Sequence, residues 1–424
     1  MKVVIVGAGF GGLRLARKLN NKPGFEVLLI DRFNFHQFQP LFYQVATAGL
    51  DASNISFPLR KVFHKSKNVR IRLAEVKEIN EKANILITQE EEISYDILVI
   101  ATGAGTNFFG NEKIATHAFP MKTTVEALQL RYRILQNFEK ALTVRDASEL
   151  AKLMNIVVVG GGPTGVEVSG ALAEMKKYVL PRDYPELDFS KMNIYLLEGS
   201  NRLLSAMSEK SSKQAKKYLE RLGVTVLTDT LVKDFDGAAV ALQNSNQIDS
   251  SIVIWAAGIK GNILNGLSND LIVKGNRLIT NRHCKLKNAE NIYAIGDIAF
   301  METPKYPNGH PQVAPVAIQQ ADVLAHNLRL MERKSDMSGL YEFEYRDKGA
   351  MATVGKNLAV VDIPKPKLHF GGFLAWMIWM SLHLMLILGV KNRFFIFINW
   401  LDNYITRDQN LRLIFRDRRP GKTT

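Results

Sequence analysis

The opening residues alternate between apolar runs and a glycine-rich turn. An apolar run at residues 3–6 leads into the turn GAGFGG at residues 7–12, and a helical spacing of apolar residues follows over 13–19. A second apolar run at residues 27–30 ends at Asp31. This pattern predicts a strand, a turn, a helix and a second strand that ends in an acid, which is the order of a dinucleotide-binding unit.

Each part of this turn has a physical role in holding a dinucleotide. Gly7 allows the tight turn, Gly9 lets the backbone approach a pyrophosphate, and Gly12 lets the helix pack close to the strand. The free N–H groups at the start of the helix face the anion. Asp31 stands where a carboxylate accepts hydrogen bonds from ribose hydroxyl groups.

The same succession of segments returns in the middle of the chain. Residues 156–159 are apolar, residues 160–165 read GGGPTG, and residues 166–175 have a helical pattern. After a longer insertion, a strand over residues 191–197 ends at Glu198. Two complete copies predict that the chain binds two dinucleotides.

Two acids of the second copy bear on its ligand. Glu198 would accept from a ribose 2′-hydroxyl and repel a 2′-phosphate, which favours NAD(H) over NADP(H) even with Arg202 nearby; the alternative is a solvated acid at a strand end. Glu167 lies early in the second helix, where the helix dipole favours a carboxylate that simply caps. It could equally hold a nicotinamide or tune the site of hydride transfer.

Further strands end in small or acidic residues. Residues 95–104 predict a buried parallel strand whose small terminal residues let a ligand approach, and residues 252–258 repeat it. Residues 292–297 predict a strand ending in Gly-Asp, where the acid can accept from a ribityl chain. A helix over residues 316–330 returns toward the same cofactor, so the first site is completed near residue 300 and the second domain is an insertion in the first.

Three other segments have weaker patterns. Residues 69–73 and 85–87 predict short strands of an antiparallel meander. Residues 33–46 are rich in aromatic and amide side chains, and predict either a packed loop or a loop laid over a flat ring. Residues 341–362 alternate like a hairpin with Lys348 at its turn, where the side chain is either a solvated lysine or a cation near a reduced flavin.

The C-terminal segment differs in kind. Residues 373–390 are apolar nearly all round, and their length is at the low end of the about 17–25 residues that span a bilayer. The helix that follows has an apolar face, and basic residues come after it; these two sets are Phe394, Phe397, Ile398, Leu401, Tyr404 and Ile405, and Arg407, Arg412, Arg416, Arg418, Arg419 and Lys422. Together with three tryptophans, these residues favour an interfacial membrane anchor over a helix that spans the membrane. A dimerisation helix pair is the alternative.

Charge and cysteine content narrow the class of partner. The chain has 55 basic and 41 acidic residues, a net charge of +14 that favours an anionic partner. Because the charge accumulates beside the apolar tail, a membrane surface is favoured over nucleic acid. Cys284 is the only cysteine, which excludes an intramolecular disulfide and suits a reducing cytoplasm. Met1 is followed directly by the first strand, so the N-terminus is expected in the cytoplasm.

Over nearly the whole chain these motifs resemble a known family, the type II NADH dehydrogenases, which are single-subunit, non-pumping NADH:quinone oxidoreductases. The matching motifs are the glycine turn at residues 7–12, FQPLFYQVA at 38–46, ATG at 101–103, GGGPTGVE at 160–167, Gly296-Asp297 and the amphipathic tail. The resemblance implies an α/β fold with two Rossmann-type dinucleotide-binding domains and a C-terminal amphipathic helical membrane anchor. It also implies FAD in the first site, NADH in the second, a quinone as electron acceptor, and a homodimer on the cytoplasmic membrane surface.

The resemblance assigns residues to each ligand and no metal. For FAD they are Gly7, Gly9, Phe10, Gly11, Gly12, Asp31, Arg32, Pro40, Gln44, Val76, Ala101, Thr102, Gly103, Gly296, Asp297, Ala317 and Lys348. For NADH they are Gly160, Gly162, Pro163, Thr164, Gly165, Glu167, Glu198, Ala257 and Gly258. The catalytic residues implied are Glu167, Lys348 and Gln319, and the quinone-binding residues are Pro315, Gln319 and Met351.

One motif departs from the family pattern. The family has an Ala-Gln-x-Ala-x-Gln run at the quinone site, and this chain has Pro315 in place of the first glutamine while Gln319 keeps the second. Proline has neither a side-chain amide nor a backbone N–H, so a hydrogen bond to a quinone carbonyl is lost. Quinone type, affinity or pose is therefore expected to differ, whereas NADH oxidation is not.

The expected organisation is an FAD-binding domain at residues 1–120 and 266–335, an inserted NADH-binding domain at 121–265, and a hairpin with membrane helices at 336–424. The resemblance implies that NADH passes a hydride to the flavin and that two electrons then reach menaquinone or ubiquinone in a respiratory chain. Association with the cytoplasmic face of the cell membrane is expected to be monotopic, with a single span at 373–390 as the alternative. The rival functions are a sulfide:quinone oxidoreductase, which relies on cysteines beside the flavin, and a non-catalytic FAD- and NAD-binding sensor.

Overall fold

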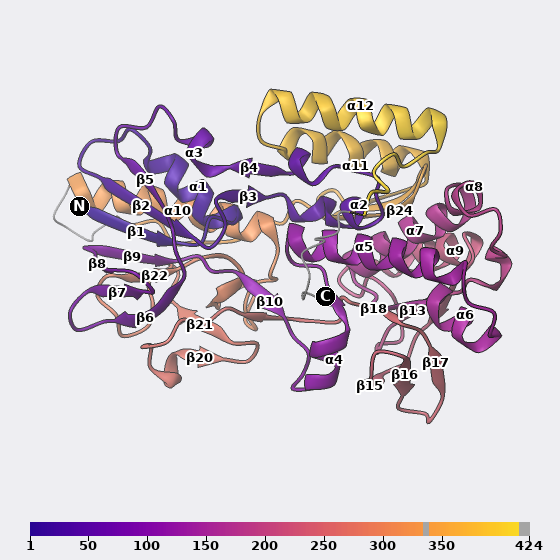
Figure 1. Cartoon of the computed structure of the whole chain (residues 1–424). Coiled ribbons are helices and arrows are strands. Elements are labelled where there is room, and N and C mark those ends of the chain that lie inside the picture. Colours follow the sequence, from indigo (N-terminus) through magenta and orange to yellow (C-terminus); the bar gives the residue numbers. More distant parts are fainter. Residues whose placement is uncertain (334–338, 415–424) are drawn as a thin grey trace. The chain divides into compact units, whose positions relative to one another are not determined.

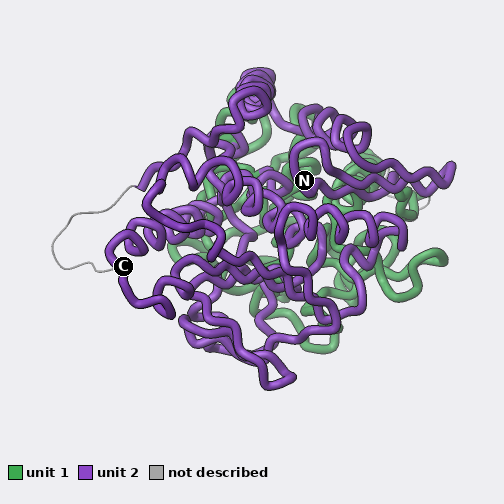
Figure 2. Tube along the Cα trace, turned by 90° about the vertical axis from the view of Figure 1, so that its right-hand side faces the viewer, with its two compact units in different colours: residues 1–37, 57–105, 259–347 green, residues 38–56, 106–258, 348–424 purple. Residues whose placement is uncertain are grey.

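The structure is a computed structural model of the chain and describes residues 1–333 and 339–414 (Figure 1). The four basic residues predicted beyond residue 414 lie outside this part. The chain forms two compact units, each built from three segments (Figure 2). Unit 1 comprises residues 1–37, 57–105 and 259–347, and unit 2 comprises residues 38–56, 106–258 and 348–424.

Unit 1 is organised around a parallel sheet of five strands in the order β22-β9-β1-β2-β5. The strands are β1 (Lys2–Val6), β2 (Glu26–Asp31), β5 (Val69–Leu73), β9 (Ile97–Ile100) and β22 (Ile292–Ala294). The central strand β1 pairs with β2 and β9, and its apolar run is buried, as expected for a parallel sheet covered on both faces. Helices α1 (Phe10–Leu19) and α10 (Ala314–Arg333) pack against each other.

The remaining elements of unit 1 are short. They are β3 (Phe35–Gln37), α3 (Leu59–Val62), β6 (Val76–Asn80), β7 (Ile85–Thr88), β8 (Glu92–Ser94), β19 (Ile259–Gly261), β20 (Ile272–Val273), β21 (Arg277–Thr280) and β23 (Ala299–Met301). At the segment boundaries lie β4 (Ser56–Pro58) and β10 (Ala104–Thr106).

Unit 2 repeats the parallel sheet in the order β11-β18-β12-β13-β14. These strands are β11 (Phe119–Pro120), β12 (Ile156–Val159), β13 (Ile194–Leu197), β14 (Val224–Leu227) and β18 (Ile252–Trp255). The long helices are α5 (Thr124–Ala141), α6 (Ala147–Met154), α7 (Pro163–Tyr178) and α9 (Glu209–Arg221). Shorter elements are α2 (Phe42–Ala46), α4 (Glu112–His117), α8 (Leu180–Asp183), β15 (Val232–Phe235), β16 (Ala239–Leu242) and β17 (Gln247–Asp249).

An antiparallel sheet and two helices complete unit 2. The sheet contains β24 (Ala350–Gly355), β25 (Leu358–Ile363) and β26 (Leu368–Gly371), and β24 packs along α7. Helices α11 (Phe373–Leu386) and α12 (Val390–Thr406) lie side by side, drawn in yellow in Figure 1. One face of β25 packs on α11.

Three predictions of local structure were wrong. Residues 69–73 are not part of a meander, because β5 pairs in parallel with β2 at the edge of the large sheet; the meander consists of β6, β7 and β8. The hairpin expected over residues 341–362 begins only at β24, and its turn lies at Lys356-Asn357, where Asn357 takes a positive φ of 64°. Residues 33–46 form a short strand, a 3₁₀ turn and helix α2 rather than an irregular loop.

The tail also differs from one expectation. The apolar run that begins at residue 373 does not continue as one helix to residue 390, because α11 ends at Leu386 after 14 residues and α12 begins at Val390. Among residues 1–333 and 339–414, no helix has both the length and the apolar character that a bilayer span requires. The amphipathic second helix is confirmed.

Candidate functional site

The glycine turn between β1 and α1 is shaped by contacts that exclude side chains. At Gly7, whose φ is +106°, an added Cβ would lie 2.2 Å from the carbonyl oxygen of Ala101, and at Gly12 it would lie 1.8 Å from that of Gly7. At Gly9, just before α1, an added Cβ would meet no atom within 4 Å. Two glycines therefore close the turn, and the third leaves open space at a helix N-terminus where an anion can approach.

The turn between β12 and α7 has the same geometry. Gly160 has a φ of +109°, and an added Cβ at Gly165 would lie 1.8 Å from the carbonyl oxygen of Gly160. Gly162 precedes α7 and again has open space around its missing Cβ, whereas Pro163 and Thr164 form the first turn of the helix. Each unit therefore presents one cradle of the shape that a dinucleotide pyrophosphate requires.

An acid stands beside each cradle. Asp31 accepts hydrogen bonds from the N–H groups of Ala8 at 2.6 Å and Phe33 at 2.8 Å, and Glu198 accepts one from Gly161 at 2.5 Å. Burial raises the pKa of Asp31, and the two N–H groups oppose this effect. Each carboxylate oxygen has a second lone pair, so both acids tie the strand end to the turn and keep acceptor capacity for ribose hydroxyl groups.

The position of Arg202 is compatible with Glu198 accepting from a ribose hydroxyl group. Its guanidinium donates to the carbonyl oxygens of Ser205 at 2.6 Å and Met207 at 3.2 Å. The cation is therefore held by its own loop, whereas a site for a 2′-phosphate uses an arginine that is directed at the ribose.

Residues distant in sequence brace the first cradle, and the sequence patterns missed them. Asn262 and Thr102 exchange two hydrogen bonds, from the Thr102 hydroxyl at 2.7 Å and from the Asn262 amide at 3.0 Å. Buried Gln320, on α10, accepts from the N–H of Gly296 at 2.7 Å. These hydrogen bonds fix two strand ends that were predicted to bind the cofactor. The side-chain amides that make them could not be predicted, because hydrophobic periodicity does not show which amide will bond a distant backbone group.

Other predicted FAD residues of unit 1 lie around the same strands. The Phe10 ring packs edge-on to His36 at 5.4 Å between centroids, and His36 Nδ1 bonds the carbonyl oxygen of Ala8 at 2.8 Å. Burial lowers the pKa of His36 to about 4, so this unpredicted residue is neutral at neutral pH. Arg32 lies over a neighbouring phenylalanine ring, and Val76 is a buried residue at the start of β6.

Glu167 is a buried acid on α7. An added Cβ at Gly170 would lie 1.6 Å from the carbonyl oxygen of Val354, so α7 and β24 approach backbone to backbone. This approach brings the Thr353 N–H to 3.5 Å from Oε1 of Glu167. Burial raises the pKa of Glu167 to about 8, because few groups replace the water that an ionised carboxylate needs.

The carboxyl group of Glu167 lines a cavity of about 330 Å³ within unit 2. Gln44 lies in its wall, donates to the Tyr43 hydroxyl at 2.8 Å and accepts from Trp400 Nε1 at 2.8 Å. The buried Nε1 of Trp379 lies near Glu167 and makes no regular hydrogen bond with the described residues. The other aromatic residues of the wall are Trp376, Tyr178 and Tyr404. A cavity with several aromatic residues in its wall and a buried carboxyl group beside them suits a flat, polar-edged ring.

The predicted quinone residues are divided between the two units. Pro315 and Gln319 lie on α10 of unit 1, whereas Lys348 and Met351 lie in unit 2. The Gln319 amide both donates to and accepts from the backbone of Arg346, each at 3.1 Å. Lys348 is exposed just before β24. The predicted FAD residues Pro40 and Gln44 also belong to unit 2.

The last helix turns its polar side to the protein and its apolar side outward. Asn403 donates to the carbonyl oxygen of Gly49 at 3.0 Å, and Asn392 donates to that of Asn54 at 3.0 Å. The exposed apolar side chains of α11 and α12 are Phe373, Leu374, Met377, Leu382, Met385, Leu386, Val390, Phe394, Phe395, Phe397, Ile398, Leu401 and Ile405. An exposed apolar patch of this extent marks a surface that another apolar phase covers.

The family is established by sequence comparison. A family model described as pyridine nucleotide-disulphide oxidoreductase matches residues 1–321, and a model of the NDH2 C-terminal domain matches residues 348–408. The chain therefore belongs to the pyridine nucleotide-disulphide oxidoreductases. A type II NADH:quinone oxidoreductase of Mycobacterium tuberculosis is 34% identical over 417 residues, covering 96% of this chain and 88% of the relative. Within the larger class, the chain is thus a member of the type II NADH:quinone oxidoreductases.

Two further comparisons agree with this family assignment. A type II NADH:quinone oxidoreductase of Staphylococcus aureus is 27% identical over 368 residues, covering 84% of this chain and 88% of the relative. The solved structure of NDH2 from Plasmodium falciparum in complex with NADH has a TM-score of 0.88 at 22% identity, covering 98% of this chain and 99% of that one. The predicted family, α/β fold with two dinucleotide-binding domains, and oxidoreductase class with FAD, NADH and quinone are confirmed.

Proposed function

We propose that this chain transfers a hydride from NADH to bound FAD and then two electrons to a membrane quinone. The observation that carries the proposal is the pair of matching cradles, each with an acid at the end of its second strand. One chain with two such sites can hold a resident and an exchanging dinucleotide. FAD supplies the hydride acceptor and two-electron donor, which no side chain can provide.

The first cradle is proposed to hold FAD and the second NADH. The FAD contacts are those predicted from residues Gly7 to Asp31 and from the strand ends at Thr102 and Gly296. The NADH contacts are those predicted from residues Gly160 to Glu167, with Glu198 at the ribose and Ala257 and Gly258 after β18. Glu198 favours NADH over NADPH because a carboxylate repels a 2′-phosphate.

Glu167 is proposed to hold a proton for the quinone reaction. A carboxyl group with a pKa near 8 is mostly protonated at neutral pH, so it can donate a hydrogen bond or a proton within the cavity. Lys348, Gln319, Pro315 and Met351 remain the proposed quinone-side residues. Because the Gln319 amide is engaged with Arg346, its contact with a quinone would require these two bonds to be exchanged.

The exposed apolar face of α11 and α12 is proposed to lie on an anionic membrane. Ile405 is 72% exposed and Val390 is 82% exposed, so both are available to the acyl-chain boundary, while the net charge of +14 favours anionic lipid. Monotopic association with the cytoplasmic face, as a homodimer, completes the proposal. The functional domains proposed are residues 1–120 with 266–335 for FAD, 121–265 for NADH and 336–424 for the membrane.

Steady-state oxidation of NADH by the flavin-loaded enzyme tests the proposal. We expect turnover with a soluble quinone, slower turnover with NADPH, and none with sulfide as the electron donor. The sulfide reaction is disfavoured because Cys284 is fully buried and burial raises its pKa to about 12. Absence of NADH turnover with FAD present would favour the sensor instead.

A further inference from the structure

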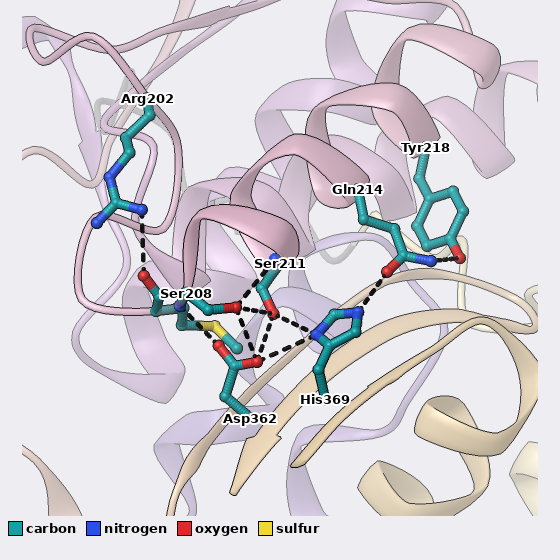
Figure 3. A network of polar contacts seen from close by, with 8 residues as sticks. Arg202, Ser208, Ser211, Gln214, Tyr218, Asp362 and His369 are labelled. Atoms are coloured by element: carbon teal, nitrogen blue, oxygen red, sulfur yellow. Dashed lines mark hydrogen bonds and ion pairs between the residues drawn. The ribbon is translucent and has the colours of Figure 1, made fainter. Parts of the chain in front are cut away.

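A polar network joins the start of α9 to the C-terminal sheet (Figure 3). Oδ2 of Asp362, on β25, accepts from the N–H of Ser208 at 2.7 Å. Oδ1 accepts from the hydroxyl groups of Ser208 at 3.0 Å and Ser211 at 2.8 Å, and lies 3.1 Å from Nδ1 of His369 on β26. Burial alone would raise the pKa of Asp362, but these hydrogen bonds lower it overall, so the group is a carboxylate.

The network extends along α9 and fixes its position. His369 Nε2 lies 2.8 Å from Oε1 of Gln214, and the Gln214 amide donates to the Tyr218 hydroxyl at 2.6 Å. Ser208 is the N-cap of α9, and its hydroxyl accepts from the N–H of Ser211 at 3.2 Å. A carboxylate at this helix end is favoured by the helix dipole and by the unpaired N–H groups of the first turn.

Asp362 occupies a strand whose two faces contact different helices. Ala359 and Val361 face α11 and form a small apolar cluster with Ala375. Because side chains alternate along a strand, Asp362 points to the opposite face, where it meets α9. The same short strand therefore supports the apolar C-terminal helix on one side and the start of α9 on the other.

The segment that Asp362 holds leads back to the second cradle. Ser208 directly follows the loop of residues 199–207, and this loop begins just after Glu198. In this loop Ser200 donates its N–H to Oε1 of Glu198 at 2.7 Å, and Leu204 donates its N–H to the carbonyl oxygen of Gly161 at 2.8 Å. Leu204 is 2% exposed and takes a positive φ of 49°, so the surrounding contacts hold this part of the loop in a strained backbone conformation.

We propose that Asp362 is a positioning residue for NADH binding. By fixing Ser208 it anchors the far end of the loop whose near end carries Glu198 and whose middle contacts the glycine turn. The inference rests on the proposed function, since it takes Glu198 and this cradle to be the NADH site. It assigns a role in substrate affinity to a residue of the C-terminal domain that does not itself line the cradle.

The experiment compares Asp362→Asn with wild-type flavin-loaded enzyme. An amide of the same shape can keep its oxygen toward the Ser208 N–H, but its NH₂ group then faces the two serine hydroxyl groups, which must turn from donating to accepting. The substitution also removes the negative charge that strengthens these hydrogen bonds. We expect the dissociation constant for NAD⁺ and the KM for NADH to rise about tenfold, since one charge-assisted hydrogen bond commonly accounts for that factor. Flavin content, kcat and the KM for quinone should stay within about twofold.

Glu220→Gln is the matched control, because it makes the same chemical change on α9 at an exposed ion pair with Lys216. It should leave all constants unchanged. Ser208→Ala keeps the N–H that bonds Asp362 and should raise the KM for NADH less than Asp362→Asn does.

Two results would overturn the proposal. One is an unchanged NAD⁺ dissociation constant in Asp362→Asn; the other is a parallel loss of flavin, kcat and quinone affinity, which a general structural role would cause. Glu198→Gln separates this failure from that of the proposed function. If that variant weakens NADH binding and Asp362→Asn does not, only the role of Asp362 is wrong; if Glu198→Gln has no effect, the NADH site itself is misassigned.

Discussion

Substitution of Glu167 by glutamine tests the account of its buried carboxyl group. Glutamine has nearly the same shape and keeps an acceptor for the Thr353 N–H, but it cannot ionise. In the wild type, the pKa of about 8 in the folded chain compares with 4.5 as the ordinary value. The folded state therefore holds a proton that the unfolded state releases between these two pH values.

The sign and size of the effect follow from this difference. Because the folded pKa of an acid is raised, wild-type stability falls as pH rises from about 4.5 to about 8, by roughly 5 kcal/mol in all. The Glu167→Gln variant does not lose stability in this way, because glutamine has no proton to release in this pH range. Its stability relative to wild type should therefore increase across the window, reaching a gain in melting temperature on the order of 10 °C above the folded pKa.

The assay is thermal unfolding followed by near-ultraviolet circular dichroism, at pH values from about 5 to about 9, for both proteins with the same flavin content. Glu220→Gln serves as the control, since its exposed carboxyl group should give a curve parallel to wild type. Parallel curves for Glu167→Gln and wild type through the whole range would refute the assignment of a protonated, desolvated carboxyl group to α7.

Three further predictions concern other parts of the chain. Gly12→Ala, whose Cβ would lie 1.8 Å from the Gly7 oxygen, should yield protein without visible flavin absorbance and with a lower melting temperature. Ile405→Glu should reduce co-sedimentation with anionic vesicles about tenfold, because it removes an exposed apolar side chain from the surface proposed to bind the membrane. Trp400→Phe should lower the free energy of unfolding by about 1 kcal/mol in denaturant titrations, because the amide oxygen of half-buried Gln44 loses its donor.

The dinucleotide-binding units could be predicted because their signals are local. The turn, helix and strand that surround Gly7 and Gly160 follow one another within short segments, and the glycines are required by contacts made inside those segments. The acid at the end of each second strand is likewise fixed by sequence order. Family motifs then supplied the identity of the two nucleotides.

Strand pairing was less accessible from sequence. The alternation of Arg70 and Arg72 with apolar residues in β5 is typical of a half-exposed strand, and it does not specify a parallel partner at a sheet edge. Lys348-Gly349 has the composition of a turn, and Gly349 does take a positive φ, yet the hairpin turns later, at Asn357. Asparagine tolerates the left-handed region well enough to compete with glycine for such a position.

The long-range polar contacts could not be predicted at all. Trp400 and Gln44 are 356 residues apart, and Asp362 and Ser208 are 154 residues apart, yet each pair forms a hydrogen bond under 3 Å. Such pairs depend on how the C-terminal sheet and helices pack on α2 and α9. Hydrophobic periodicity places those elements individually and carries no information about which polar side chains meet.

The most direct test of the proposed electron path is rapid-mixing absorbance spectroscopy of the flavin-loaded enzyme. Mixing with NADH should bleach the flavin band in a single turnover, and subsequent addition of a menaquinone or ubiquinone analogue should restore it as quinol forms. A flavin that NADH does not reduce, or that stays reduced when either quinone is added, would contradict the account.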